Sequence, residues 1–173
     1  TTTTTSTTTT TTAESVPNLA DMLVHYWPIY PEDTADYVNG ANMTAMTQLD
    51  QQADLFGAPN SAAYIHDRAT YFTVPPGVYF NGGAFTVSAW VKPYECAQYS
   101  RLFDFGNGPQ ADNIVVAIST SNNCKPFVNF EHDGQAYAPN KLPLYVWTHL
   151  SVLFDGANIK IYMNAAWVYT MSV

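Results

Sequence analysis

The stretch WTHLSVLFDGANIKIYMNAA, residues 147–166, holds two alternating runs of apolar and polar residues joined by a tight-turn signal. An alternation with period two is typical of a strand that buries one face. The apolar faces comprise Leu150, Val152 and Phe154 in the first run and Ile159, Ile161 and Met163 in the second. The Asp-Gly pair at 155–156 lies between the runs and favours a tight connection. The stretch therefore predicts an antiparallel β-hairpin with one buried face.

Similar short runs recur along the chain. We expect further strands at 23–29, 62–66, 71–74, 84–92 and 113–120. Gly, Pro, Asn and Asp cluster between these runs, as turns require. No stretch has a long helical period, and residues 43–55 fit either a short helix or an irregular loop. Many short strands with tight turns predict an all-β protein, an antiparallel two-sheet sandwich.

Four stretches together resemble a laminin G-like domain of the concanavalin A-like superfamily, which also includes pentraxins. They are LVHYWPI (23–29), DRATYFTVPPGVYFNGGAFTVSAWVKP (67–93), RLFDFGNGPQADNIVVAIS (101–119) and WTHLSVLFDGANIKIYMNAA (147–166). The resemblance implies a jelly roll of two curved antiparallel sheets. It also implies extracellular roles in adhesion, matrix assembly and the binding of glycans or proteins. Trp27, Trp90 and Trp147 lie in these motifs, and we expect them in the core.

The sequence departs from this family at two places. Asn164-Ala165-Ala166 stands where the family has Asn-Gly, and a turn that needs positive φ would be strained by alanine. Family domains also continue beyond this hairpin with a closing strand beside the first strand, whereas this sequence ends at Val173. The closing strand is expected either further along the same chain or from a neighbouring copy.

The last residues suggest how a neighbouring copy could pair. Alternation places Trp167, Tyr169 and Met171 on one face of the terminal strand. An edge strand with an aromatic stripe and unpaired backbone groups favours strand addition from another chain. This pattern predicts a homo-oligomer or a filament built through strand edges.

The N-terminal segment differs in composition from the rest. Residues 1–22 are predicted to form a threonine-rich tract with a connector, and residues 23–173 the sandwich domain. The tract is either a bare flexible linker or a mucin-like stalk with O-linked glycans. The predicted O-glycosylation sites are Thr1, Thr2, Thr3, Thr4, Thr5, Ser6, Thr7, Thr8, Thr9, Thr10, Thr11 and Thr12. Asn42, in Asn-Met-Thr, is a predicted N-glycosylation site.

Charge and cysteine content indicate the environment. The net charge is −8 with six Lys and Arg residues, which disfavours nucleic acids and anionic membranes as partners. No apolar run is long enough to span a bilayer. Cys96 and Cys124 are expected to form one disulfide between strand-connecting loops, the alternative being two free buried thiols. A disulfide predicts an extracellular or cell-surface location.

Catalytic patterns are scarce. Glycoside hydrolases of this fold need two facing carboxylates, and Glu131 and Asp133 are the one such pair in a strand-like context. A turn glycine follows them, so we interpret them as solvated loop acids. The histidines, His25, His66, His132 and His149, lack zinc-protease spacing. His149 is expected to be a hydrogen-bonded structural residue. The sequence therefore predicts a protein that is not an enzyme.

Calcium is the one cofactor that the sequence brings into consideration. Loop oxygens that could bind Ca²⁺ belong to Asp33, Asp36, Asp104, Asp112 and Asn113. The alternative is that these residues form turns by bonding their own backbone.

Two functional hypotheses follow. The first is a structural or adhesive module of an extracellular glycoprotein assembly. The second is a glycan-binding, lectin-like module tethered by a mucin-like stalk. A sugar site would require an exposed concave aromatic surface with converging polar groups. An assembly module would require exposed edges that meet a neighbouring copy.

Overall fold

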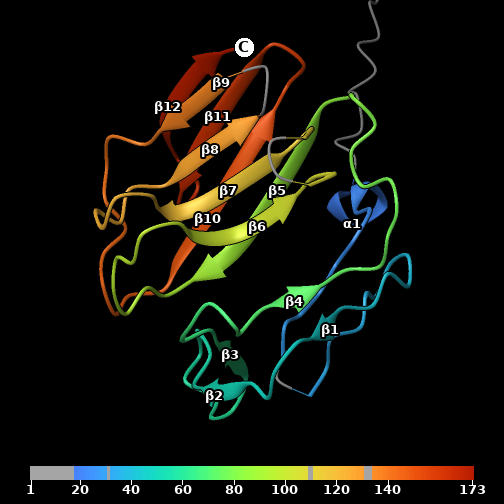
Figure 1. Ribbon diagram of the computed structural model, residues 1–173, viewed down its shortest axis with the longest axis vertical. Coiled ribbons are helices and arrows are strands. Elements are labelled where there is room, and N and C mark those ends of the chain that lie inside the picture. Colours follow the sequence, from blue (N-terminus) through green and yellow to red (C-terminus); the bar gives the residue numbers. More distant parts are fainter. Residues whose placement is uncertain (1–17, 31, 109–110, 131–133) are drawn as a thin grey trace, which may run out of the picture. The chain divides into compact units, whose positions relative to one another are not determined.

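The structure is a computed structural model that describes residues 18–30, 32–108, 111–130 and 134–173. These residues fall into two compact units divided between Pro76 and Gly77, and each unit is described by itself (Figure 1). The threonine tract with its predicted O-glycosylation lies outside the described residues. The acidic pair Glu131 and Asp133, together with His132, lies outside them too.

The first unit contains short elements and much irregular chain. Its elements are α1 (Leu19–Met22), β1 (Thr44–Ala45), β2 (Asp50–Gln52), β3 (Ala62–Tyr64) and β4 (Phe72–Thr73). β1 pairs with β4 and β2 with β3, both antiparallel. Residues 43–55 were expected to form a short helix or an irregular loop, and they contain instead the two short strands β1 and β2 with irregular chain between them.

The predicted strand over 23–29 is wrong. This segment runs irregularly, and Ile29 takes a φ of 57°, outside the β region. The backbone nitrogen of Tyr26 donates to the Asp36 carboxylate at 3.0 Å instead of to a neighbouring strand. The segment is therefore held by a side chain, in a way that hydrophobic alternation does not reveal.

The second unit consists of two four-stranded antiparallel sheets, stacked one behind the other in Figure 1. One sheet has the order β12-β11-β10-β5, and the other has the order β6-β7-β8-β9. Their bounds are β5 (Phe85–Val91), β6 (Ser100–Phe105), β7 (Ile114–Ser119), β8 (Phe127–Phe130), β9 (Gly134–Tyr137), β10 (Thr148–Phe154), β11 (Asn158–Met163) and β12 (Ala166–Ser172). The predicted antiparallel sandwich is confirmed.

The core of this unit lies between the two sheets. It comprises Val116, Val128, Phe130, Ala136, Ala138, Leu150, Val152, Ile159 and Ile161. The predicted hairpin is present, since β10 and β11 pair with Val152 opposite Ile161. Both side chains are almost fully buried, and this burial supplies the main driving force for folding of the unit.

The turn between β10 and β11 is organised by Asp155. Its carboxylate accepts the backbone N–H groups of Ala157 at 3.0 Å and Asn158 at 2.8 Å. Lys160 lies 2.8 Å away, and this ammonium, followed by the backbone donors, lowers the pKa of the Asp155 carboxyl. The aspartate of the Asp-Gly pair thus stabilises the turn because its side chain accepts hydrogen bonds from the backbone N–H groups of the turn.

The turn between β11 and β12 has the positive φ values expected for an Asn-Gly turn. Asn164 has a φ of 50° and Ala165 a φ of 64°. The Asn164 side chain accepts the backbone N–H of His149 at 2.9 Å, which ties the turn to β10. Ala165 therefore adopts a left-handed conformation that costs an alanine more than a glycine.

The predicted stripe of Trp167, Tyr169 and Met171 on one face of β12 is wrong. A register shift beside Tyr162 adds a residue to β12, so that Trp167 pairs with Tyr162 and Tyr169 with Ile161. Tyr169 and Met171 pack against the core, whereas Trp167 is 64% exposed and donates from Nε1 to Thr170. The bulge turns Trp167 to the opposite face.

Trp90 also departs from its predicted core position. It lies 49% exposed on the outer face of β5, with its ring 5.2 Å from that of His149. His149 in turn lies 3.4 Å from the Ser151 hydroxyl, in keeping with its expected structural role.

Candidate functional site

An open groove of about 740 Å³ lies on the second unit, over the outer face of the β6-β7-β8-β9 sheet. It is lined by Tyr99, Arg101, Asp104, Gly106, Gly108, Asn113, Val115, Thr120, Ser121, Phe127, Asn129, Gln135 and Tyr137. Alternation along the strands explains this composition, because Val116, Val128 and Ala136 point into the core and their neighbours point outward. The face opposite the core is therefore free to carry polar and aromatic side chains.

The first row of side chains across this face is mainly polar. Asp104 pairs with Val115, Val115 with Asn129, and Asn129 with Gln135, so one residue of each strand lies in line. Adjacent strands are about 4.8 Å apart, and a row over four strands thus spans about 14 Å. Asn129 is half-buried and lines the groove. This row presents amide donors and acceptors to a ligand.

The second row lies one pleat further along the strands and includes two adjacent aromatic residues, on β8 and β9. Arg101 pairs with Ala117, Ala117 with Phe127, and Phe127 with Tyr137. The rings of Phe127 and Tyr137 are 4.8 Å apart, so the buried phenylalanine supports the exposed tyrosine. The Tyr137 hydroxyl donates to Gln135 Oε1 at 2.9 Å, and this bond uses the amide oxygen of Gln135 and not its NH₂ group.

One end of the groove is held by the disulfide. Cys96, in the β5–β6 connection, and Cys124, in the β7–β8 connection, are bonded with Cα atoms 4.8 Å apart, which confirms the predicted bridge between loops. Tyr99 follows Cys96 closely in the first of these connections and is 56% exposed. The disulfide therefore restrains the loop that presents Tyr99 to the groove.

The other end of the groove is formed by the β6–β7 loop. Gly106 lies so close to Asn113 that any side chain at position 106 would overlap the Asn113 amide. Asp112, with a φ of 53°, accepts a hydrogen bond from Asn107 Nδ2 at 3.0 Å. Within β6, the Asp104 carboxylate is paired with the Arg101 guanidinium at 2.8 Å.

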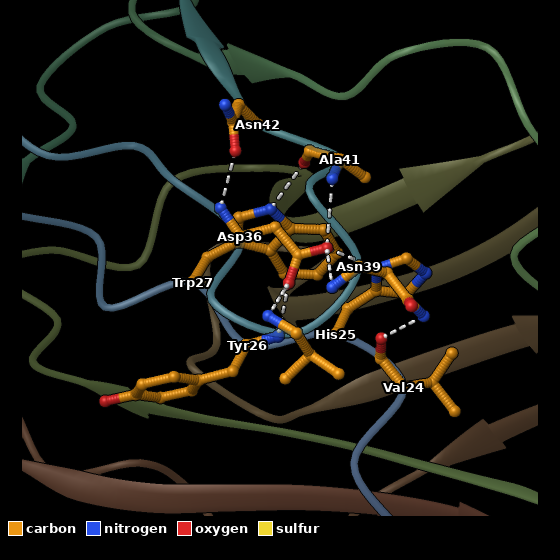
Figure 2. Close-up of polar contacts among 9 residues, drawn as sticks. Val24, His25, Tyr26, Trp27, Asp36, Asn39, Ala41 and Asn42 are labelled. Atoms are coloured by element: carbon orange, nitrogen blue, oxygen red, sulfur yellow. Dashed lines mark hydrogen bonds and ion pairs between the residues drawn. The ribbon is translucent and has the colours of Figure 1, made fainter.

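The other two predicted calcium ligands lie in the first unit, where the loop 24–42 folds around Asp36 (Figure 2). The Asp36 carboxylate is buried and accepts five hydrogen bonds. The donors are His25 Nδ1 at 2.8 Å and the backbone N–H groups of Tyr26 at 3.0 Å, Val38 at 3.1 Å, Asn39 at 3.2 Å and Ala41 at 3.1 Å. Burial opposes ionisation, but these donors outweigh it, and the pKa of Asp36 is held below its usual range.

These contacts bear on calcium. The oxygens of Asp36 already accept five N–H groups, and Asp33 accepts the N–H of Ala35 and the hydroxyl of Tyr37. These two residues thus behave as turn formers, the alternative that the sequence left open. No group of three or more His, Cys, Asp or Glu side chains that could hold a metal occurs within 18–30, 32–108, 111–130 and 134–173.

Asn42, the predicted N-glycosylation site, lies beside the same network. Its side-chain oxygen accepts the backbone N–H of Asp36 at 2.9 Å, and the residue is exposed. Figure 2 shows its amide nitrogen on the side away from Asp36. Glycosylation of Asn42 stays a prediction.

The sequence of the sandwich also matches the model of a known protein family. A laminin G model described as the concanavalin A-like lectin/glucanases superfamily matches residues 66–173. This chain belongs to that superfamily. No curated protein matches the chain. Among the helices of the described residues, none is long and apolar enough to cross a membrane.

A solved structure supports the superfamily fold. Domain 4 of AbnA, a GH43 extracellular arabinanase from Geobacillus stearothermophilus, in complex with arabinotriose, matches with a TM-score of 0.61. The identity is 18%, and the match covers 86% of this chain and 76% of that domain's chain. At this identity the likeness concerns the fold.

Sequence reasoning did not find the groove. Strands β8 and β9, which supply Phe127, Asn129, Gln135 and Tyr137, were not predicted, because four-residue strands give little periodic signal. A usable signal was present in FVNF (127–130), where the alternation of Val128 and Phe130 with Phe127 and Asn129 marks two faces.

Proposed function

We propose that this protein is a carbohydrate-binding module that holds a neutral oligosaccharide in the groove of the β6-β7-β8-β9 sheet. The observation that carries the proposal is the arrangement of two amides, Asn129 and Gln135, beside two aromatic rings, Phe127 and Tyr137, on the neighbouring strands β8 and β9. Aromatic rings offer an apolar face to the C–H surface of a sugar, and amides bond its hydroxyls. A sugar site requires aromatic rings with converging polar groups. This combination therefore favours the glycan-binding hypothesis over the assembly hypothesis.

The charges of the groove favour a neutral ligand. Arg101, the cation of the lining, is paired with Asp104 at 2.8 Å, so its charge is largely compensated. Asn113, Asn129 and Gln135 supply uncharged polar groups. The groove is open, and an extended chain of sugars fits such a shape better than a single enclosed residue does.

The proposal is for binding without catalysis. A glycoside hydrolase that uses two carboxyl groups needs one on each side of the glycosidic bond that it cleaves. Among the lining residues that the structure describes, Asp104 is the one carboxylate, and it is neutralised by Arg101. The disulfide supports an oxidising, extracellular setting for this activity. The predicted glycans of the threonine tract and of Asn42 belong to the same proposal.

Isothermal titration calorimetry with arabinotriose, xylotriose and cellotriose tests the proposal. We expect at least one trisaccharide to bind, and Tyr99→Ala and Asn129→Ala each to weaken it by roughly three- to tenfold. Trp167→Ala is the matched control, because Trp167 is an exposed aromatic residue on the other sheet. Absence of binding to all three sugars, or a loss confined to Trp167→Ala, would contradict the proposal.

A further inference from the structure

The first unit is strongly acidic. Residues 18–76 contain seven Asp and Glu residues against one basic residue, Arg68, and the other five Lys and Arg residues of the chain lie in 77–173. Such an imbalance creates a negative field that attracts cationic groups and repels anions. The unit therefore favours a partner of positive charge.

This acidic unit also exposes a cluster of tyrosines, which we call the tyrosine cluster: Tyr26, Tyr30 and Tyr37. Their exposed fractions are 51%, 45% and 65%. The rings of Tyr26 and Tyr37 are 6.4 Å apart and inclined by 57°. Tyrosine rings that remain in water while they gather together are typical of binding surfaces, since each gives a large contact area at a small entropic cost.

The backbone holds the tyrosine cluster in place. The N–H of Tyr37 donates to the carbonyl of Tyr26 at 3.0 Å, and the N–H of Tyr26 is fixed to the buried Asp36 carboxylate. Tyr30 is joined to Asp33 through the Asp33 N–H at 3.1 Å. The loop is therefore pre-organised, and a ligand does not have to order it on binding.

A carboxylate is built into the tyrosine cluster. The Tyr37 hydroxyl donates to Asp33 Oδ2 at 2.5 Å. This bond is the main cause of the lowered pKa of Asp33 and of the raised pKa of Tyr37, to which the phenols of Tyr30 and Tyr26 contribute further. At neutral pH the cluster thus presents the ionised carboxylate of Asp33 beside the neutral phenol of Tyr37. A phenol that donates to an anion is richer in electrons, which strengthens its attraction for a cation over the ring.

We propose that the tyrosine cluster with Asp33 is a docking surface for a basic peptide segment that presents arginine. The planar guanidinium of arginine stacks on tyrosine rings and donates several hydrogen bonds to a carboxylate. The charge of the first unit is complementary to such a segment. The surface shares no residue with the groove of the second unit, and the inference does not rest on the proposed carbohydrate binding.

Nuclear magnetic resonance of the whole chain tests the inference with two synthetic peptides. One is acetyl-Gly-Arg-Gly-Arg-Gly-amide, and the other replaces each arginine with citrulline, a neutral residue of nearly the same shape. We expect the arginine peptide to shift the signals of Tyr26, Tyr30 and Tyr37, and the citrulline peptide to bind at least threefold more weakly. The affinity should fall when the NaCl concentration rises from 20 to 300 mM, because the attraction is electrostatic.

Three variants and one control locate the site. Tyr26→Ala and Tyr37→Ala should each weaken the arginine peptide about two- to fivefold, the range for one exposed ring and a cation. Asp33→Asn removes the charge and keeps the shape and one accepting oxygen, while its NH₂ group can donate to the Tyr37 hydroxyl instead of accepting from it. It should weaken the binding of the arginine peptide similarly. Tyr71→Ala, an exposed tyrosine of the same unit, should leave it unchanged.

The results of these experiments distinguish an arginine peptide from other ligands of the tyrosine cluster. Equal binding of the two peptides, an effect of Tyr71→Ala as large as that of Tyr37→Ala, or shifts confined to groove residues would each overturn the inference. A response of the tyrosine cluster to trisaccharides but not to the arginine peptide would assign the surface to sugars and would also overturn it. Amide protection of Val38, measured in every variant, verifies that the Asp36 network is intact.

Discussion

Replacement of Asp36 by alanine should unfold the loop 24–42 or most of the first unit. The substitution removes the common acceptor of five donors, all within 3.2 Å, and leaves the His25 ring and four backbone N–H groups without it. A hydrogen bond to a charged group contributes about 1.5–3 kcal/mol. Five such values would approach or exceed a typical total stability of about 5–15 kcal/mol, so part of the loop must open and let its N–H groups reach water.

The magnitude is better bounded by the cost of a buried donor that loses its acceptor and cannot reach water. That cost is about 1–3 kcal/mol per donor, and we expect the free energy of unfolding of the first unit to fall by at least this amount. Urea denaturation measures the total, and amide hydrogen exchange at Val38, Asn39 and Ala41 measures the local loss. Asp36→Asn should behave similarly, because its NH₂ group would face N–H donors.

Asp54→Asn is the matched control. Asp54 is half-buried and accepts the N–H groups of Phe56 at 2.8 Å and Ala58 at 2.9 Å in hydrogen bonds that are exposed to solvent. Because water can replace these bonds, the substitution should cost about 1 kcal/mol or less. A decrease for Asp36→Ala below about 1 kcal/mol, or one equal to that of Asp54→Asn, would refute the reasoning that the buried carboxylate organises the loop.

The same carboxylate predicts a dependence on pH. The pKa of Asp36 is lower in the folded chain than its ordinary value, so the unfolded chain binds the proton more tightly. The stabilisation is therefore complete above the ordinary pKa of about 3.9 and is lost as the pH falls from there toward the folded value. Urea titrations between pH 7 and pH 3 should show this decline in the native chain, and a smaller one in Asp36→Asn.

Three further changes test other parts of the structure. Ala165→Gly should raise the free energy of unfolding by about 0.5–1 kcal/mol, because relief of the left-handed strain exceeds the added entropy of the unfolded chain; thermal melts check it, and a destabilised variant would contradict the turn geometry. Gly106→Ala should displace the Asn113 amide and reduce trisaccharide affinity in calorimetry, whereas unchanged affinity would remove Asn113 from the site. Reduction of the bond between Cys96 and Cys124 should lower the stability of the second unit by about 2–4 kcal/mol and weaken sugar binding, and equal melting with and without reductant would argue against this role.

The hairpin, the sandwich and the disulfide could be predicted from the sequence. Alternation in residues 147–163 marks the buried faces of β10 and β11, and Asp155 with Gly156 marks the turn between them. These signals are local, since each depends on residues a few positions apart. The two cysteines could be placed in loops because each follows a predicted strand, 84–92 or 113–120, and the structure joins them.

The failures concern irregular local geometry. The segment 23–29 has the composition of a strand, but Asp36 binds its backbone with a side chain and removes it from any sheet. In β12, one added residue at a bulge turns Trp167 away from Tyr169, although the spacing in sequence is that of one face. A β-bulge does not change the hydrophobic pattern of the sequence, and neither does a carboxylate that accepts hydrogen bonds from backbone amides. The hydrophobic pattern alone therefore reveals neither feature.

The sequence by itself determined the fold class, the acidic character of the first unit and the residue types available for binding. Only the tertiary structure decided which of them meet. Asp104, Asn129 and Gln135 form one row because three separate strand registers align them, and register depends on the packing of whole sheets. Tyr26 and Tyr37 meet because the loop between them closes on a buried carboxylate. Both surfaces arise from contacts between distant positions, and these contacts form only when burial of the core or of a charge compensates the entropy of bringing the chain together.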